Sequence, residues 1–128
     1  MALTDKQKIG NIGEKLAEKF LVKRGFAVLE KNYRKKWGEI DIVVQKDKVL
    51  HFIEVKAVSH PPTQADDDFR PEENVHPWKL KRLSRAIQTY LLERKVSCET
   101  EWQLDIIAVF LDLKNKKAKF RVTDNVVL

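Results

Sequence analysis

Acidic residues and a lysine occupy alternate positions in two neighbouring apolar segments of the sequence, residues 38–42 and 52–56. Both segments are rich in β-branched residues, which are typical of strands. Because side chains alternate between the faces of a strand, Asp41, Glu54 and Lys56 are predicted to share one face. Carboxylates are ligands for hard divalent cations, and a nearby lysine can orient water or stabilise negative charge. These residue types suit metal-assisted hydrolysis of a phosphodiester.

Residues 45–48 form a short connection, which predicts that the two segments pair as an antiparallel hairpin. We expect a two-residue turn to place Asp41 opposite Phe52, and a four-residue turn to place Asp41 directly opposite Glu54. Opposed Cβ atoms lie ~5 Å apart and diagonal ones ~7–8 Å apart, so both registers let the carboxylates share one ion. Adjacent like charges are destabilising, and a bound cation would remove that cost.

An ordinary polar sheet face is the alternative interpretation. The pattern acidic-x-Lys is weak in so charged a chain, since it also begins at Glu93 and at Asp112. Glu93 is expected at a helix end, and Asp112 where a strand runs into a turn. Only Glu54 is predicted to lie mid-strand between apolar neighbours, with an acidic residue on the adjoining strand.

Two helices are predicted to flank these strands. Residues 4–24 form the first, with Thr4 or Asp5 as its N-cap and Gly25 as its stop signal. The second begins at Pro77. Their apolar stripes at helical spacing are Ile9, Ile12, Leu16 and Phe20 in the first helix, and Leu80, Leu83, Ile87 and Leu91 in the second.

Further strands are predicted at residues 27–33, 102–111 and 119–123. Residues 59–76 hold three of the four prolines and are predicted to form a long mobile loop. The order of elements predicts an α/β fold with a mixed sheet of about five strands and two main helices. We expect a single domain covering residues 1–128.

Composition restricts the class of partner and the compartment. The net charge of +6 favours a polyanionic partner. A single cysteine, Cys98, excludes an intrachain disulfide framework and fits a reducing compartment. No apolar run reaches the ~18 residues of a membrane span, and no signal peptide is recognisable, so we expect a cytoplasmic protein without membrane contact.

Several motifs together resemble the bacterial YraN family. They are Gly10-Asn-Ile-Gly13-Glu14 with the helix that follows, Asn32-Tyr33-Arg34, Gly38-Glu39-Ile40-Asp41-Ile42, Phe52-Ile53-Glu54-Val55-Lys56, Lys79-x-x-x-Leu83 and Leu104-Asp105-Ile106-Ile107. That family is assigned to the PD-(D/E)XK nuclease superfamily and is similar to archaeal Holliday junction resolvases. The resemblance implies a restriction-endonuclease-like core and hydrolysis of DNA, with branched DNA in repair or recombination as a candidate substrate.

The resemblance also implies roles for individual residues. Asp41 and Glu54 would bind Mg²⁺ or Mn²⁺, Lys56 would be the catalytic lysine, and Glu14 would join the catalytic and metal-binding set. Gly10 and Gly13 would allow the first helix to approach the site closely. One departure concerns substrate contacts: Val58 stands where the family often has an arginine. A nucleic-acid-binding module without cleavage activity is therefore the second interpretation.

Basic residues beside aromatic ones are candidates for contacts with nucleic acid. They are Arg34, Lys35 and Lys36 between Tyr33 and Trp37, and Lys79, Lys81 and Arg82 beside Trp78. A lysine-rich helix surface without a ligand is the alternative interpretation for the second group. A homodimer or a partner protein is also compatible with the sequence, by analogy with resolvases that make paired cuts.

Overall fold

The predicted order of helices and strands is present in the computed structural model, which describes residues 2–59 and 75–128. The described elements are α1 (Asp5–Lys23), β1 (Ala27–Lys35), β2 (Gly38–Lys46), β3 (Val49–Ser59), α2 (Pro77–Glu93), β4 (Glu101–Asp112) and β5 (Lys117–Thr123). The predicted loop at residues 59–76 falls largely on residues 60–74, which lie outside the described ranges.

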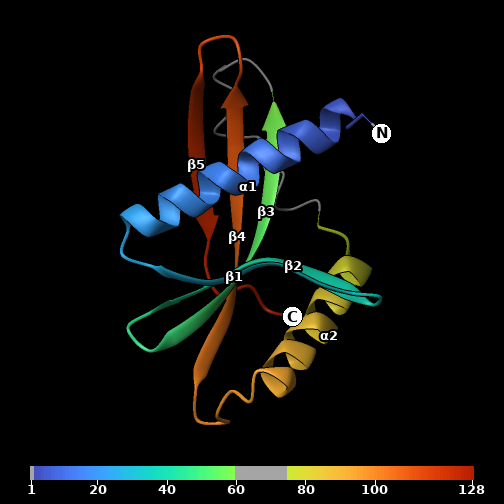
Figure 1. Cartoon of the computed structure of the whole chain (residues 1–128), viewed down its shortest axis with the longest axis vertical. Coiled ribbons are helices and arrows are strands. Elements are labelled where there is room, and N and C mark those ends of the chain that lie inside the picture. Colours follow the sequence, from blue (N-terminus) through green and yellow to red (C-terminus); the bar gives the residue numbers. More distant parts are fainter. Residues whose placement is uncertain (1, 60–74) are drawn as a thin grey trace.

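One five-stranded sheet in the order β1-β2-β3-β4-β5 forms the centre of the molecule (Figure 1). β3 and β4 are parallel, and the other neighbouring pairs are antiparallel. A parallel pair needs a crossover connection, and α2 lies within the one that joins β3 to β4. The fold class predicted from the sequence is confirmed: α/β, with a mixed sheet and two main helices in the order expected for a restriction-endonuclease-like core.

Each helix packs on its own apolar cluster of the sheet. Phe52 and Leu104 belong to the cluster that includes the buried face of α2, whereas Ile53 and Ile107 belong to the cluster that includes the buried face of α1. Successive residues of β3 and β4 therefore point to opposite layers, as strand alternation requires. The central strands are covered on both faces, and polar side chains buried there need a specific partner.

The turn between β2 and β3 consists of Asp47 and Lys48, both with positive φ. This backbone suits the right-handed twist of a two-residue hairpin. The pairs run from Lys46↔Val49 to Ile42↔Ile53, and the same register continued by one residue would set Asp41 opposite Glu54. Our expectation that this register needs a four-residue turn was wrong, because residues 45 and 46 belong to the strand.

The start and the buried face of α1 follow from local sequence. Thr4 is the N-cap: its hydroxyl accepts the Gln7 amide, and the Gln7 side chain accepts the Thr4 amide. The buried face consists of Gly13, Ala17 and Leu21, with Ile9, Leu16 and Phe20 partly buried beside it. The predicted stripe was thus wrong for Ile12, which is 40% exposed. The buried face instead follows a spacing of four residues that begins with the small residues Gly13 and Ala17.

Close approach of α1 to the sheet depends on one of its two glycines. A Cβ atom at Gly13 would collide with the side chain of Ala57 on β3. Nothing lies within 4 Å of the corresponding position at Gly10. The expectation that both glycines serve this approach is therefore wrong for Gly10.

α2 is held at both ends. His76 caps its first turn by accepting the Trp78 amide at 3.3 Å, and Pro77 occupies the first helical position. At its other end, Glu93 accepts hydrogen bonds from the Tyr33 hydroxyl and, at 2.8 Å, from the Lys35 ammonium of β1. These contacts fix the helix against the β1–β2 hairpin.

Candidate active site

The two central carboxylates lie where β2 and β3 separate. Regular pairing ends at Ile42↔Ile53, and beyond it the Val55 amide donates to Asp41 Oδ2 at 2.7 Å. Asp41 therefore replaces a main-chain acceptor at a fork between the strands. Asp41 is 8% exposed and Glu54 is 3% exposed, so both acids are taken from water.

The simple alternation predicted for β2 is wrong at Ile40. Ile40 packs in the cluster on the α2 side together with Val43, although Ile42 packs on the α1 side. Since β2 no longer pairs with β3 before Ile42, the strand is free to leave the local plane of the sheet. This change of direction leaves Asp41 at the fork, within reach of both helices.

Glu14 joins the site from α1. Its carboxyl lies close enough to that of Asp41 for each group to shift the pKa of the other. Burial is the main cause of a raised pKa at Glu14. The absence of a side chain at Gly13 allows this turn of α1 to lie against Ala57 of β3, and Glu14 follows directly in the chain.

Lys79 joins the site from α2. Its ammonium lies 2.7 Å from Glu54 Oε1, while 47% of its side chain remains exposed. The sequence suggested Lys79 as a contact for nucleic acid, and pairing with Glu54 was not foreseen. The parity of β3 explains it, because Glu54 lies on the same side of the strand as Phe52, which packs on α2.

The cluster holds more negative charge than its surroundings offset. Burial raises the pKa of Asp41 to about 7, and the neighbouring Glu14 carboxylate adds to the shift despite the Val55 amide. Burial likewise raises the pKa of Glu54 to about 7, with the Asp41 charge as the next cause and Lys79 opposing both. Perturbed acids of this kind gather at functional sites more often than elsewhere.

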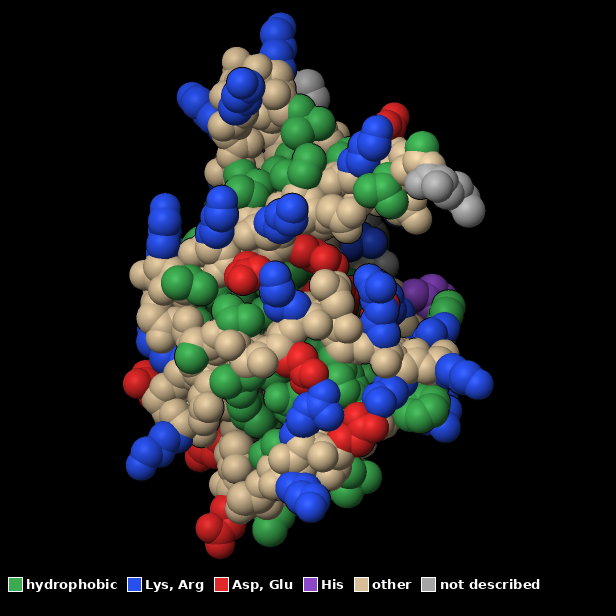
Figure 2. Space-filling view, in the orientation of Figure 1, with side chains coloured by type: hydrophobic (Ala, Val, Ile, Leu, Met, Phe, Trp, Pro, Cys, Tyr) green, Lys and Arg blue, Asp and Glu red, His purple; other side chains and the backbone are tan. Residues whose placement is uncertain are grey.

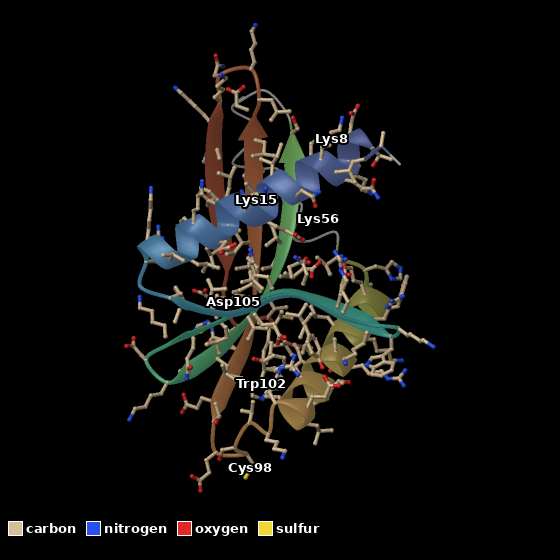
Figure 3. All side chains as sticks on the ribbon, viewed as in Figure 1. Lys8, Lys15, Lys56, Cys98, Trp102 and Asp105 are labelled. Atoms are coloured by element: carbon tan, nitrogen blue, oxygen red, sulfur yellow. The ribbon has the colours of Figure 1, made fainter. Side chains whose placement is uncertain are left out.

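Lys56 lines a cavity beside the acids. Figure 3 places it on β3, close to where α1 crosses that strand. The cavity has a volume of about 420 Å³, and Glu39 and Lys79 line it as well. Lys56 thus shares a wall with the cation that contacts Glu54. Asp41 and Glu14 face a second hollow of about 180 Å³ between α1 and the first two strands.

The donors present suit a hard divalent cation. Glu14, Asp41 and Glu54 offer carboxylate oxygens, which Mg²⁺ and Mn²⁺ prefer. Their raised pKa values indicate that added positive charge would be stabilising here. Over residues 2–59 and 75–128, however, no three histidine, cysteine or acidic side chains are arranged as a ready-made metal site. One Glu54 oxygen faces Lys79 instead, so a cation would have to displace that ammonium.

The basic residues at the end of β1 and in the turn that follows it have different surroundings. Arg34 pairs with Glu39 at 3.4 Å in an exposed ion pair, and Lys35 is occupied with Glu93 at the end of α2. Lys36 is exposed. Of these three predicted contacts for nucleic acid, Arg34 and Lys35 have acidic partners that they would have to give up.

The basic residues of α2 lie on its exposed side. Lys81 is exposed, and the Arg82 guanidinium lies 5.2 Å from the centre of the Trp78 ring. Figure 2 shows acidic side chains near the centre of one face, with lysine and arginine side chains around them. Basic side chains at the rim can attract a polyanion, while the acidic side chains that they surround can still favour a metal ion.

Three residues of the cavity wall were missed as site residues: Glu39, His76 and Trp78. Glu39 adds negative charge that contributes to the raised pKa of Asp41 and of Glu14. The alternation that selected Asp41 already placed Glu39 beside it, so that signal was available. His76 and Trp78 needed the position of α2, which local sequence does not give.

The structure defines an α/β protein with a five-stranded mixed sheet and two buried acids at a strand fork. The sequence profile of the uncharacterised protein family UPF0102 matches residues 13–109. The chain belongs to this family, also called the YraN family, as its motifs predicted. Neither of the two described helices is long and apolar enough to cross a membrane.

Relatives match most of the chain. The UPF0102 protein of Campylobacter fetus subsp. fetus is 39% identical over 108 residues, which cover 84% of this chain and 85% of the relative. The UPF0102 protein of Campylobacter hominis is 32% identical, and the match covers 94% of this chain and 95% of that relative. Among solved structures, SfsA of Pyrococcus furiosus in complex with Ca²⁺ has a TM-score of 0.38 at 16% identity. The match covers 99% of this chain and 67% of that one.

Proposed function

We propose that the protein is a Mg²⁺- or Mn²⁺-dependent endonuclease that hydrolyses DNA phosphodiester bonds. The observation that carries the proposal is the meeting of Glu14, Asp41 and Glu54, from three different elements, beside a cavity lined by Lys56. A structural cluster would not need two buried acids and a half-buried third acid so close together. A hydrolytic site for a polyanion needs both the acids and the cations around them.

The residues divide the chemistry between them. The carboxylates would hold the divalent cation, which supplies a water of lowered pKa and polarises the phosphoryl oxygen. The Lys56 ammonium would orient the attacking water or stabilise the negative charge that develops on phosphorus. Lys79, once released from Glu54, and Arg82 line the same cavity and would bind phosphate oxygens.

The substrate that fits best is branched DNA, in repair or recombination. The motive is the family resemblance to junction resolvases, together with basic side chains on both α2 and the β1–β2 turn. These two surfaces are joined by Arg82, which donates to the Lys36 carbonyl at 3.5 Å. A substrate that contacts both would bend around the acids between them.

A cleavage panel tests the proposed activity. Purified protein with Mn²⁺ is incubated with duplex, single-stranded, flap and four-way junction DNA, and Glu54→Gln and Lys56→Ala are compared with the wild type. We expect cleavage that EDTA abolishes, with both variants slower by about a hundredfold or more, the loss typical of a single electrostatic catalytic group. Equal cleavage by Glu54→Gln, or none by the wild type on any substrate, would contradict the proposal.

A binding module without cleavage is the second candidate. The Lys79–Glu54 ion pair favours it, because an internal ammonium already occupies one face of the acidic cluster. The apolar Val58, in place of a family arginine, removes one expected cation. Salt-dependent DNA binding without metal-dependent cleavage would support this function, and absence of binding at low salt would exclude it.

A further inference from the structure

The cavity beside the acids has more room and more varied chemistry than one phosphate group requires. Its volume is about 420 Å³, within the range of small-molecule sites. Three cations, Lys56, Lys79 and Arg82, share its wall with two rings, those of His76 and Trp78. Cations suit phosphate, whereas exposed rings do not. The lining therefore indicates a ligand that carries both a negative charge and a flat apolar surface.

Trp78 is exposed beyond what packing explains. It is 55% exposed at the second position of α2, while the helix buries Leu83 and Ile87 on its other side. The Arg82 guanidinium lies over the indole ring at 5.2 Å. The His76 ring lies beside it, with centroids 6.4 Å apart, and caps the helix through the Trp78 amide. An indole fixed by its neighbours but open to solvent is a ready surface for stacking.

Two of the three cations, Lys56 and Lys79, lie on the side of the cavity that adjoins Glu54. Lys79 contacts Glu54 directly, and Lys56 is two residues further along β3. A phosphate placed among them would lie next to the carboxylates that the proposed function assigns to catalysis. A base attached to that phosphate through its sugar would extend toward Trp78. A nucleotide has a phosphate and a base on opposite sides of its sugar, which matches this arrangement of cations and rings.

We infer that this cavity binds one unpaired nucleotide, with its base on the Trp78 indole and its phosphate among Lys56, Lys79 and Arg82. The inference rests on the proposed function and narrows its substrate class to DNA with a single-stranded segment beside the cleaved bond. A base inside a duplex is stacked on both faces and cannot offer one to the indole. Base–aromatic stacking contributes about 1–3 kcal/mol per base, which is enough to select unpaired ends.

Equilibrium binding tests this inference separately from cleavage. Fluorescently labelled duplexes with blunt ends and with 3′ or 5′ single-stranded overhangs are titrated with the full chain in EDTA at low salt. Trp78→Ala is compared with Trp78→Phe, which keeps a ring. The matched control is Leu92→Ala, which removes another exposed apolar side chain of α2, 80% exposed and near the opposite end of the helix.

We expect the wild type to bind one kind of overhang ~5- to 150-fold more tightly than a blunt end, the range that corresponds to stacking of one base. Trp78→Ala should lose this preference and keep its blunt-end affinity, whereas Trp78→Phe and Leu92→Ala should retain it. No preference in the wild type, equal weakening of both ligands by Trp78→Ala, or no DNA binding at all would each overturn the inference.

A second measurement removes the dependence on Trp78→Ala folding. The chain has three tryptophans, and Trp37→Phe with Trp102→Phe leaves Trp78 as the sole indole. Its fluorescence should be quenched by an oligothymidylate, and an unchanged signal at saturating oligonucleotide would count against stacking. If the overhang preference holds without cleavage, the endonuclease proposal fails and the pocket stands. If the wild type cleaves DNA but shows no preference for overhangs, the endonuclease proposal stands and the nucleotide pocket fails.

Discussion

At the scale of single residues, Asp41 and Glu54 are the main support for a cation site, because both are buried acids with a pKa of about 7. Ordinary carboxyls in unfolded chains ionise near pH 4. The folded state therefore holds protons at these positions that the unfolded state has already released. Ionisation of these two acids at neutral pH therefore lowers the free energy of unfolding, and a bound cation would offset that loss.

The pH dependence of stability follows from these two groups. Since their pKa values are raised on folding, their stabilising contribution is complete below about pH 4 and is lost as the pH rises to about 7. Each unit of pKa difference corresponds to about 1.4 kcal/mol. Urea unfolding of the metal-free protein at several pH values should show this decline.

Two conservative variants serve as matched controls for that decline. Asp41→Asn keeps an oxygen for the Val55 amide, and Glu54→Gln keeps the shape of its side chain. Each should flatten the change in unfolding free energy between about pH 4 and 7, and Mn²⁺ should flatten it in the wild type. A wild-type curve without any fall in this window would show that the acids are not strained by burial.

Strand alternation predicted that Asp41 and Glu54 lie close together, but it fails at Ile40, so the sequence did not reveal the fork between β2 and β3 at which Asp41 lies. Lys79 could not be placed in the same way. Its contact with Glu54 depends on how α2 returns over the sheet after residues 60–74, and no local pattern encodes that path. The same reason explains why Trp78 was recognised as an aromatic near cations but not as part of a cavity.

At the scale of elements, the site depends on how closely α1 approaches β3. Gly13 sits against Ala57, and Glu14 follows directly in the chain. The helix was predictable from its capping residues and its spacing, but the face that it buries was predictable only in part. The hydrophobic stripe suggested Ile12, whereas close packing selected the smaller residues Gly13 and Ala17.

Substitution of the two glycines of α1 separates these effects. Gly13→Ala introduces a methyl group that collides with Ala57, so we expect a loss of about 1–3 kcal/mol in unfolding free energy and weaker Mn²⁺ binding. Gly10→Ala meets nothing within 4 Å and should stabilise the helix by about 0.5–1 kcal/mol. Chemical denaturation of both variants gives the comparison. Equal behaviour of the two would mean that close approach of α1 is unimportant.

At the scale of the whole molecule, the acids come from α1, β2 and β3, and Lys79 of α2 contacts Glu54. Figure 2 shows a rim of lysine and arginine side chains around acidic ones on one face. The α/β class, the strand order along the chain and the acids were predictable from sequence. The basic rim was predictable only in part, because the sequence does not reveal whether a lysine side chain is paired with an acid. Lys35 is held by Glu93, while Lys36 and Lys81 are exposed.

Rim lysines should govern the affinity for DNA and its dependence on salt. Lys36→Ala and Lys81→Ala are each expected to weaken binding a few-fold and to reduce the slope of log affinity against log salt by about one unit. Lys116→Ala, in the turn between β4 and β5 at the far end of the sheet, is the control and should change neither. Fluorescence anisotropy at several salt concentrations measures both quantities. An equal effect of Lys116→Ala would indicate binding by net charge alone.

The central claim is that Glu14, Asp41 and Glu54 together bind a divalent cation. Calorimetric titration of Mn²⁺ into the protein at pH 7.5 tests it without any substrate, with Asp41→Asn as the comparison. We expect saturable binding to the wild type and at least a tenfold weaker affinity in the variant, since one of the carboxylate ligands is lost. No saturable binding to the wild type, or unchanged binding to Asp41→Asn, would contradict it.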